Sequence, residues 1–255
     1  MTVGVSAVPV AELLPWRERF REEMRCQIVH DSLHARAGWT ESFLLTVGPV
    51  IAGYGAAAVA GPWRGTKTVF EFYLMPEFRP RAEEFFARFV AVAGVTAYEV
   101  QTNDELLTRV VRPWSGAAEV ERLVFHDHIT TMLAAQGARL RRATPADATR
   151  IFPHQHEPVG DWLLEVEDRI AATGGILFHY NRPYGDLYME TAAPFRRRGF
   201  GSYLVQELKR ICREGGSIPC ARCSPANIAS RKTLLKAGFA PCAEILVGRL
   251  VPTGE

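Results

Sequence analysis

The sequence is poor in cysteine and contains no long apolar run. Its 255 residues include five cysteines, an odd number that does not suit a disulfide-stapled scaffold. No apolar stretch reaches the roughly 20 residues needed to cross a bilayer, and the first residues lack a basic region followed by an apolar core. We therefore expect a cytoplasmic protein that does not act at a membrane.

Metal-ligand clusters and a large excess of charge are also missing. Cys220 and Cys223 form a C-x-x-C pair, but no second Cys/His pair stands at zinc-like spacing. The His-x-His pairs at 126–128 and 154–156 have no ligand cluster beside them, so we expect no metal. A net charge of +2 is too small to predict a nucleic-acid partner.

With 47% hydrophobic and 23% charged residues, the chain is globular and long enough for two domains of ordinary size. Its most informative segment is 196–201, Arg-Arg-Arg-Gly-Phe-Gly, between a strand-like run at 187–192 and a helical pattern. The first turn of a helix offers about four free N–H groups and the positive end of its dipole. Gly199 and Gly201 have no Cβ to obstruct a ligand, so the segment predicts a diphosphate site.

The spacing of these glycines fits neither G-x-G-x-x-G nor a Walker A loop. It matches Arg/Gln-x-x-Gly-x-Gly/Ala, and over residues 138–251 the chain resembles the GNAT superfamily of acyl-CoA-dependent N-acyltransferases. Asn227 and the later pair Gly238-Phe239 resemble a second conserved block of that family, in the order it requires.

The surrounding patterns predict strands and helices that suit this resemblance. Strands are expected at 139–143, 162–166, 175–180, 184–191 and 218–223, and helices after Thr144-Pro145, at 200–213 and at 229–236. The expected class is α/β (an α+β mixed sheet). Each of two GNAT-like domains would hold a mostly antiparallel central sheet flanked by helices, with a splayed strand pair in the C-terminal one.

Residues 69–94 repeat the strand, Phe-Arg, helix order of 187–213, which indicates an internal duplication. The N-terminal copy has Pro80, Ala82 and Glu84 where the second has Arg197, Gly199 and Gly201. Proline removes a donor and glutamate repels a diphosphate, so we expect no phosphate loop there. An ordinary helix start would also explain these residues, and it too excludes phosphate binding.

We therefore predict a degenerate GNAT-like domain at 1–137 and an acetyltransferase domain with the acetyl-CoA site at 138–255. Residues 1–137 carry 13 basic and 16 acidic side chains and residues 138–255 carry 17 and 12, so the basic half holds the loop. An amphipathic segment from 8 to 29 places Trp16, Phe20 and Met24 on one face, for which core packing is favoured over partner binding.

The resemblance implies that the strand 186–191 diverges from the strand 218–223 and that the pantetheine arm of acetyl-CoA pairs with exposed backbone between them. A main-chain N–H there would receive the thioester oxygen. The acetyl-CoA-binding residues implied in this way are Met189, Glu190, Thr191, Arg196, Arg197, Arg198, Gly199, Phe200, Gly201, Ser202, Asn227 and Ser230.

Strand alternation puts Asp186, Tyr188 and Glu190 on one face, so these are the candidate catalytic residues, with Glu190 favoured as the general base. Solvated polar residues on an outer face are the alternative interpretation, and water can serve as the base instead. Leu234 stands where the family often has a tyrosine that protonates the CoA thiolate. Tyr188, Ser230 or water are the remaining candidate donors.

The predicted function is transfer of an acetyl group from acetyl-CoA to a primary amine of a small molecule or peptide, by a monomer or homodimer. The alternative is an acyl-CoA-binding regulatory or scaffolding protein without turnover, and a third is a phosphate-binding protein unrelated to CoA. Acidic and aromatic residues at 154–162 slightly favour a cationic acceptor, which the sequence does not identify.

Overall fold

The computed structural model describes residues 2–251 and divides into two compact units. Unit 1 is Met1–Arg122 with Ala243–Glu255, and unit 2 is Leu123–Cys242. The sequence predicted a boundary after residue 137. In the structure, the segment 123–137 belongs to the C-terminal unit and the segment 243–255 to the N-terminal one.

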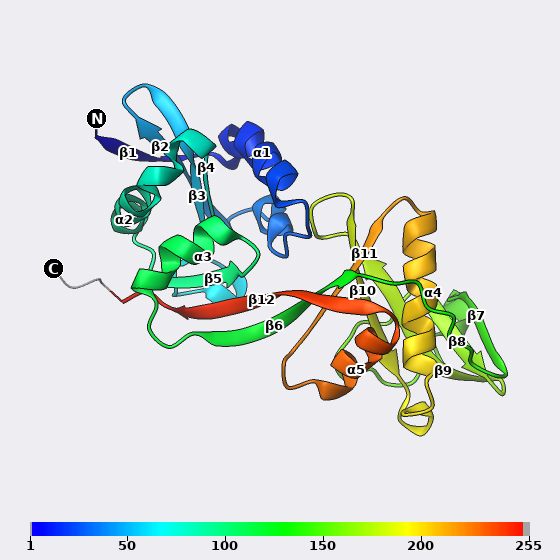
Figure 1. Ribbon diagram of the computed structural model, residues 1–255. Coiled ribbons are helices and arrows are strands. Elements are labelled where there is room, and N and C mark those ends of the chain that lie inside the picture. The colour runs from blue at the N-terminus through cyan, green and yellow to red at the C-terminus, as the bar shows by residue number, and fades with distance from the viewer. Residues whose placement is uncertain (1, 252–255) are drawn as a thin grey trace. The chain divides into compact units, whose positions relative to one another are not determined.

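The sheet of unit 1 begins with four antiparallel strands in chain order (Figure 1). A fifth strand pairs parallel to the fourth, and residues 245–249 of the last strand then pair antiparallel to the fifth. The strands are β1 (Val3–Val8), β2 (Thr40–Val47), β3 (Val50–Ala58), β4 (Thr68–Leu74), β5 (Ala97–Gln101) and β12 (Phe239–Arg249).

Three α-helices complete unit 1: α1 (Leu14–Met24), α2 (Ala82–Ala93) and α3 (Glu105–Val111). Helix α2 buries Phe85, Phe86 and Phe89 completely among the side chains of the sheet. The amphipathic face predicted near the N-terminus belongs to α1, where Phe20 is buried and Trp16 and Met24 pack beside it in a hydrophobic cluster. This face therefore forms part of the core, as favoured from the sequence.

The sheet of unit 2 repeats the same order. Four antiparallel strands are followed by a parallel fifth, and residues 123–126 of an earlier strand pair antiparallel to that fifth strand. The strands are β7 (Ala138–Arg142), β8 (Trp162–Val166), β9 (Arg169–Leu177), β10 (Tyr184–Thr191), β11 (Ile218–Cys223) and β6 (Glu119–Asp127).

Helix α4 (Phe200–Glu214) packs its apolar side on β9 and β10, and α5 (Ile228–Lys236) packs beside α4 (Figure 1). The side chain of Lys209 in α4 is 2% exposed and donates to the carbonyl oxygens of Ile129 and Ala237, 2.8 Å away in each case. No helix among residues 2–251 combines the length and the apolar character needed to span a membrane.

Two local expectations were wrong. The helix predicted after Thr144-Pro145 is only the short 3₁₀ turn η6 (Pro145–Asp147). The Asp147 carboxylate accepts from the backbone and hydroxyl of Thr144 and from Arg141, which completes a capping box, but residues 148–161 then run irregularly.

The strand expected at 175–180 instead covers Arg169–Leu177, because the hairpin turn before it lies at Glu167 and Asp168. Both turn residues have positive φ, 50° and 57°, as a tight hairpin turn between right-twisted strands requires.

The buried carboxyl group of Asp104 gives a pH-dependent stability. Burial raises its pKa to about 7, although its Oδ1 caps α3 by accepting from the backbone N–H of Leu107. Since this pKa is above the unfolded value near 3.9, the stabilising contribution is present at low pH and is lost as the pH rises toward 7. We expect Asp104→Asn, which keeps a capping oxygen, to raise the melting temperature at pH 8 more than at pH 4. An equal effect at both pH values in thermal unfolding would contradict this.

Candidate functional site

Strands β10 and β11 pair over only three residues and then separate. Their parallel register runs from Tyr184 opposite Ile218 to Asp186 opposite Cys220 and ends there. On its other side β10 remains paired with β9 up to Thr191. The edge of β10 from residue 187 to 191 is therefore unpaired toward β11, which confirms the predicted divergence.

A short loop connects this edge to the N-terminus of α4. The 3₁₀ turn η7 (Ala193–Phe195) leads into Arg196 in an extended conformation, and Arg197 and Gly199 have positive φ of 61° and 87°. Gly199 is the N-cap of α4, and no side chain caps the helix. The first N–H groups of α4 thus have no side-chain acceptor, as expected of a helix start that receives an anion.

The two glycines of the loop have different physical roles. Gly199 is needed for its left-handed backbone, and a Cβ there would meet only Lys236 Nζ at 3.8 Å. A Cβ on Gly201 would lie 3.0 Å from Met189 Cε and 3.1 Å from Thr191 Oγ1. Gly201 therefore lets α4 approach the unpaired end of β10, rather than clearing space for a ligand as the sequence suggested.

The three arginines of the loop are exposed and differ in their contacts. Arg196 Nε donates to the Thr191 carbonyl at 3.1 Å, and the Arg198 guanidinium lies 5.0 Å from the ring centroid of Phe200. Phe200 itself is buried, as is Ser202 in the first turn of the helix. The loop therefore presents positive charge to solvent on an apolar base.

Asn227 and Ser230 meet at the start of α5. Asn227 Oδ1 accepts from the Ser230 backbone N–H at 3.0 Å, so this amide caps the helix and both residues remain partly or fully exposed. Leu234, where the resemblance implies a tyrosine, is 5% exposed and packs in the core of unit 2. No proton donor can act from that position.

The Glu190 carboxylate is 7% exposed and holds an irregular segment by its backbone. It accepts from the N–H groups of Gln155, His156 and Glu157 at 3.1–3.2 Å. Burial opposes ionisation of this group, but the three N–H groups and His154 outweigh it and lower its pKa. Glu190 is therefore an ionised and weakly basic carboxylate whose lone pairs are largely engaged.

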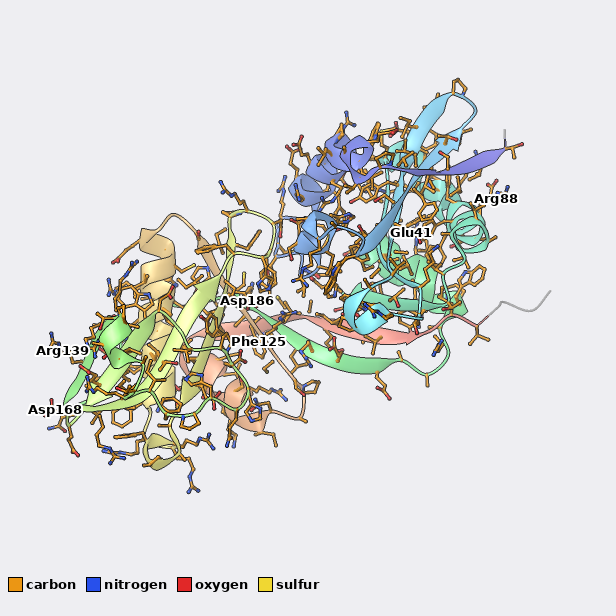
Figure 2. All side chains as sticks on the ribbon, turned by 180° about the vertical axis from the view of Figure 1, so that it is seen from behind. Glu41, Arg88, Phe125, Arg139, Asp168 and Asp186 are labelled. Carbon is orange, nitrogen blue, oxygen red and sulfur yellow. The ribbon has the colours of Figure 1, made fainter. Side chains whose placement is uncertain are left out.

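Asp186 lies where the two strands separate and is 5% exposed (Figure 2). Its Oδ2 is 3.3 Å from His179 Nε2 and 3.5 Å from Arg222 Nε. Arg139 lies on β7 at the edge of this sheet, and Asp168 lies in the turn between β8 and β9. Asp186 is thus a buried, ion-paired carboxylate in the interior of the unit.

Tyr188 lies between these two carboxylates along β10. Its hydroxyl lies 2.5 Å from the point that a Cβ on Gly175 would occupy, so the ring lies across the neighbouring strand. Burial, with Asp161 and Glu157 nearby, raises the pKa of the phenol. Tyr188 therefore keeps its proton at neutral pH.

Glu157 belongs to the acidic and aromatic segment 154–162 that the sequence associated with the acceptor, but it was not among the predicted catalytic residues. It lies in the irregular segment tied to Glu190, and its side chain is exposed. Although the side chain is open to solvent, the surrounding protein partly desolvates its carboxylate, and this desolvation with the negative charges of Asp186 and Glu190 raises its pKa. No spacing or periodicity marks this residue, because only the contact between residues 155–157 and β10 places it near the diverging strands.

The corresponding region of unit 1 is built differently. Strands β4 and β5 also pair over only two residues, Thr68 with Ala97 and Val69 with Tyr98. The turn η4 (Pro76–Arg81) leads directly into α2, and no residue from 76 to 93 has positive φ. At the start of α2, Glu84 forms an ion pair with Arg81 at 2.8 Å.

The chain's own residues cover β5 in unit 1. The Gln101 side chain donates to the Gln27 carbonyl at 2.8 Å and accepts from the Val29 N–H at 3.2 Å. The cavity bounded by Ile28, Phe70 and their neighbours has a volume of about 20 Å³. It has room for about one water molecule.

Across residues 2–251, no three His, Cys, Asp or Glu side chains gather in a way that could hold a metal ion. The C-x-x-C cysteines lie in β11, where both are buried.

Comparisons with known proteins agree with this architecture. Residues 128–239 match the family model described as the acetyltransferase (GNAT) family. A GNAT-family acetyltransferase from Colwellia psychrerythraea is 17% identical, with a TM-score of 0.72 over 97% of this chain and 99% of that one. No curated protein matches the sequence.

Two further solved structures also cover almost the whole chain. A GCN5-related N-acetyltransferase from Sphaerobacter thermophilus is 15% identical, with a TM-score of 0.59 over 99% of this chain and 97% of that one. A tandem GNAT protein from the clavulanic acid biosynthesis pathway is 10% identical, with a TM-score of 0.64 over 99% and 100% of the two chains. These similarities show a shared fold of two GNAT-like halves.

Residues 128–239 thus match the GNAT acetyltransferase family, and the chain as a whole shares its fold with GNAT proteins that contain two such halves.

The bonds of Glu190 predict a measurable stability. Glu190→Gln removes the charge from an acceptor of three N–H groups, so we expect the free energy of unfolding at pH 7 to fall by about 1–3 kcal/mol. Because the pKa of Glu190 is lowered, the advantage of the wild type should disappear as the pH falls through that value. Urea unfolding between pH 7 and pH 3 tests this, and a constant difference over the range would contradict it.

Proposed function

We propose that this protein transfers an acetyl group from acetyl-CoA to the primary amine of a small molecule or peptide. The proposal rests on two sets of backbone groups in unit 2 that lack hydrogen-bond partners and lie next to each other. The free edge of β10 ends at Thr191, and the uncapped first turn of α4 packs against it at Gly201.

The loop fits the diphosphate of CoA. The N–H groups from Gly199 to Ser202 would hold the phosphate oxygens, and exposed Arg196, Arg197 and Arg198 add positive charge. Backbone groups from Met189 to Thr191 would pair with the pantetheine arm, and an N–H there would stabilise an oxyanion. Asn227 and Ser230, at the start of α5, would also contact the bound CoA. Acetyl-CoA supplies an activated thioester.

The exposed Glu157 carboxylate, close to the ionised Glu190, gives the outer face of β10 a negative charge that favours a cationic amine as acceptor. Such an amine must lose a proton before it attacks. Glu190 was the base favoured from the sequence. Its lone pairs are engaged and its pKa is lowered, so it is better suited to holding the segment 155–157 in place. Exposed Glu157, whose pKa is raised, is the better proton acceptor.

The departing thiolate needs no strong acid, because a thiol pKa of about 8.5 lies near neutrality. Tyr188 keeps its proton and lies between Asp186 and Glu190 along β10, so it is the side-chain donor that we assign in place of the family's tyrosine. Unit 1 would not bind acetyl-CoA, since its turn has no open loop and residues 27–29 cover β5.

A CoA-binding protein without turnover is the second candidate, favoured by the apolar Leu234. Thiol release from acetyl-CoA across a panel of amines separates the two functions. Release with any amine supports the transferase, whereas tight binding without release supports the alternative.

The left-handed backbone of the loop predicts a loss of CoA affinity. A β-branched side chain is strained at the φ of Gly199, 87°, so Gly199→Val should distort the loop. We expect its dissociation constant for CoA to rise at least about tenfold in calorimetry. Glu84→Gln, at the place in unit 1 that corresponds to Gly201 of the same loop, is the control and should bind as the wild type does. Equal losses in both variants would refute the assignment.

The assignment of Glu157 predicts a pH effect on turnover. Glu157→Gln should lower kcat by about a hundredfold and remove the acid limb of the pH–rate profile, because a general base must be deprotonated. Asp161→Asn, in the same segment, controls for the loss of a charge. An unchanged kcat in Glu157→Gln, together with a low kcat in correctly folded Glu190→Gln, would assign the base to Glu190 instead.

A further inference from the structure

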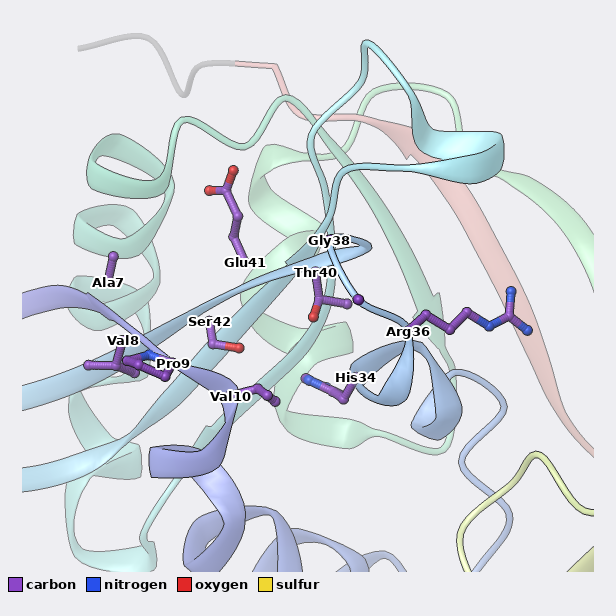
Figure 3. A pocket seen from close by; sticks show the side chains of 11 residues that line it. Ala7, Val8, Pro9, Val10, His34, Arg36, Gly38, Thr40, Glu41 and Ser42 are labelled. Atoms are coloured by element: carbon purple, nitrogen blue, oxygen red, sulfur yellow. The ribbon is translucent and has the colours of Figure 1, made fainter.

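Unit 1 contains a pocket outside the region of its diverging strands. It lies between the end of β1 and the start of β2 and has a volume of about 340 Å³. Val10, His34, Thr40 and Ser42 contribute to its lining (Figure 3). Small-molecule sites have volumes of about 300–1,000 Å³, so the pocket suits a small ligand.

Two buried polar atoms of the lining have no hydrogen-bond partner among the described residues. They are Nδ1 of His34, a residue that is 8% exposed, and Oγ of Ser42, a residue that is 5% exposed. Figure 3 shows the imidazole and the hydroxyl pointing toward one another, from η2 (Asp31–Ala35) and from β2. Because buried polar groups are normally paired, one ligand group that bridges these atoms would satisfy both.

The orientation of the His34 ring is determined by a hydrogen bond on the side that faces away from the pocket. Its Nε2 is 2.9 Å from Oε2 of Glu71, which also accepts from the Tyr54 hydroxyl at 2.9 Å. Burial opposes ionisation of Glu71, but His34, Arg17 and Tyr54 lower its pKa to about 2. The ionised carboxylate can only accept, so the hydrogen of the imidazole is on Nε2.

The charges behind the ring are balanced without His34. Arg17 and Arg21 are ion-paired with Asp31, and Arg17 Nε is 3.6 Å from Glu71. Two positive and two negative groups therefore neutralise one another behind the ring. In the tautomer with its hydrogen on Nε2, the imidazole has a lone pair on Nδ1, which can accept a hydrogen bond from a ligand.

We propose that this pocket binds a small uncharged carboxamide. The amide N–H would donate to His34 Nδ1, and the amide oxygen would accept from the Ser42 hydroxyl. The two charged side chains of the lining are engaged elsewhere, since Glu41 forms an ion pair with Lys67 and the Arg36 guanidinium lies 4.5 Å from the ring centroid of Trp39. Thr40 provides a further hydroxyl, and Val8 and Val10 provide apolar contacts.

The experiment is a titration of the full-length protein with acetamide, followed through the imidazole nitrogen signals of His34 by NMR. We expect a saturable shift of Nδ1 with little change at Nε2. Ser42→Ala should weaken binding by about tenfold, since it removes one of two hydrogen bonds. Ser6→Ala, exposed on β1 outside the lining, should bind as the wild type does.

An unchanged Nε2 signal in Ser42→Ala verifies that the bond to Glu71 and the fold persist, so that a lost response reports on binding. A crystal soaked in acetamide should show the amide between Ser42 and His34. The proposal is overturned by a response that does not saturate, by equal affinity in Ser42→Ala, by tighter binding of acetate than of acetamide, or by water alone at the two atoms.

Discussion

The short parallel pairing between β10 and β11 is the constraint on which the rest of unit 2 depends. It ends at Asp186 and Cys220, so the following residues of β10 have neighbours only in β9. Helix α4 can then begin directly above this free edge, because Gly201 has no side chain to collide with Met189 or Thr191. Backbone N–H and C=O groups without partners, at a strand edge or at a helix start, cost free energy. A ligand with hydrogen-bonding groups and negative charge would provide partners for both sets.

The two units share a topology but use it differently. Each has a parallel fifth strand whose free edge is covered by a sixth strand from the other half of the sequence, β12 in unit 1 and β6 in unit 2. Such covering removes an exposed strand edge, which would otherwise promote aggregation. In unit 1 the region beyond the pairing is taken by residues 27–29, whereas in unit 2 the corresponding loop opens through two residues with positive φ.

Glu190 is a buried carboxylate beside the candidate site that stabilises the local structure. Three N–H groups compensate for its burial, and the same bonds hold residues 155–157 over β10. That segment carries Glu157, whose pKa is raised. One carboxylate therefore positions the element on which a more basic one is exposed.

Local patterns in the amino-acid sequence by themselves determined much of this protein. Glycine and arginine spacing identified the loop at 196–201, and periodicity gave strands β8 and β11 with the bounds observed, because these depend on neighbours in the chain. The exchange of β6 and β12, the irregular course after Asp147, and the positions of Glu157 and His34 were decided only by tertiary structure. They depend on contacts between residues far apart in the sequence, such as Gln155 with Glu190 and His34 with Glu71, and no local spacing encodes such pairs.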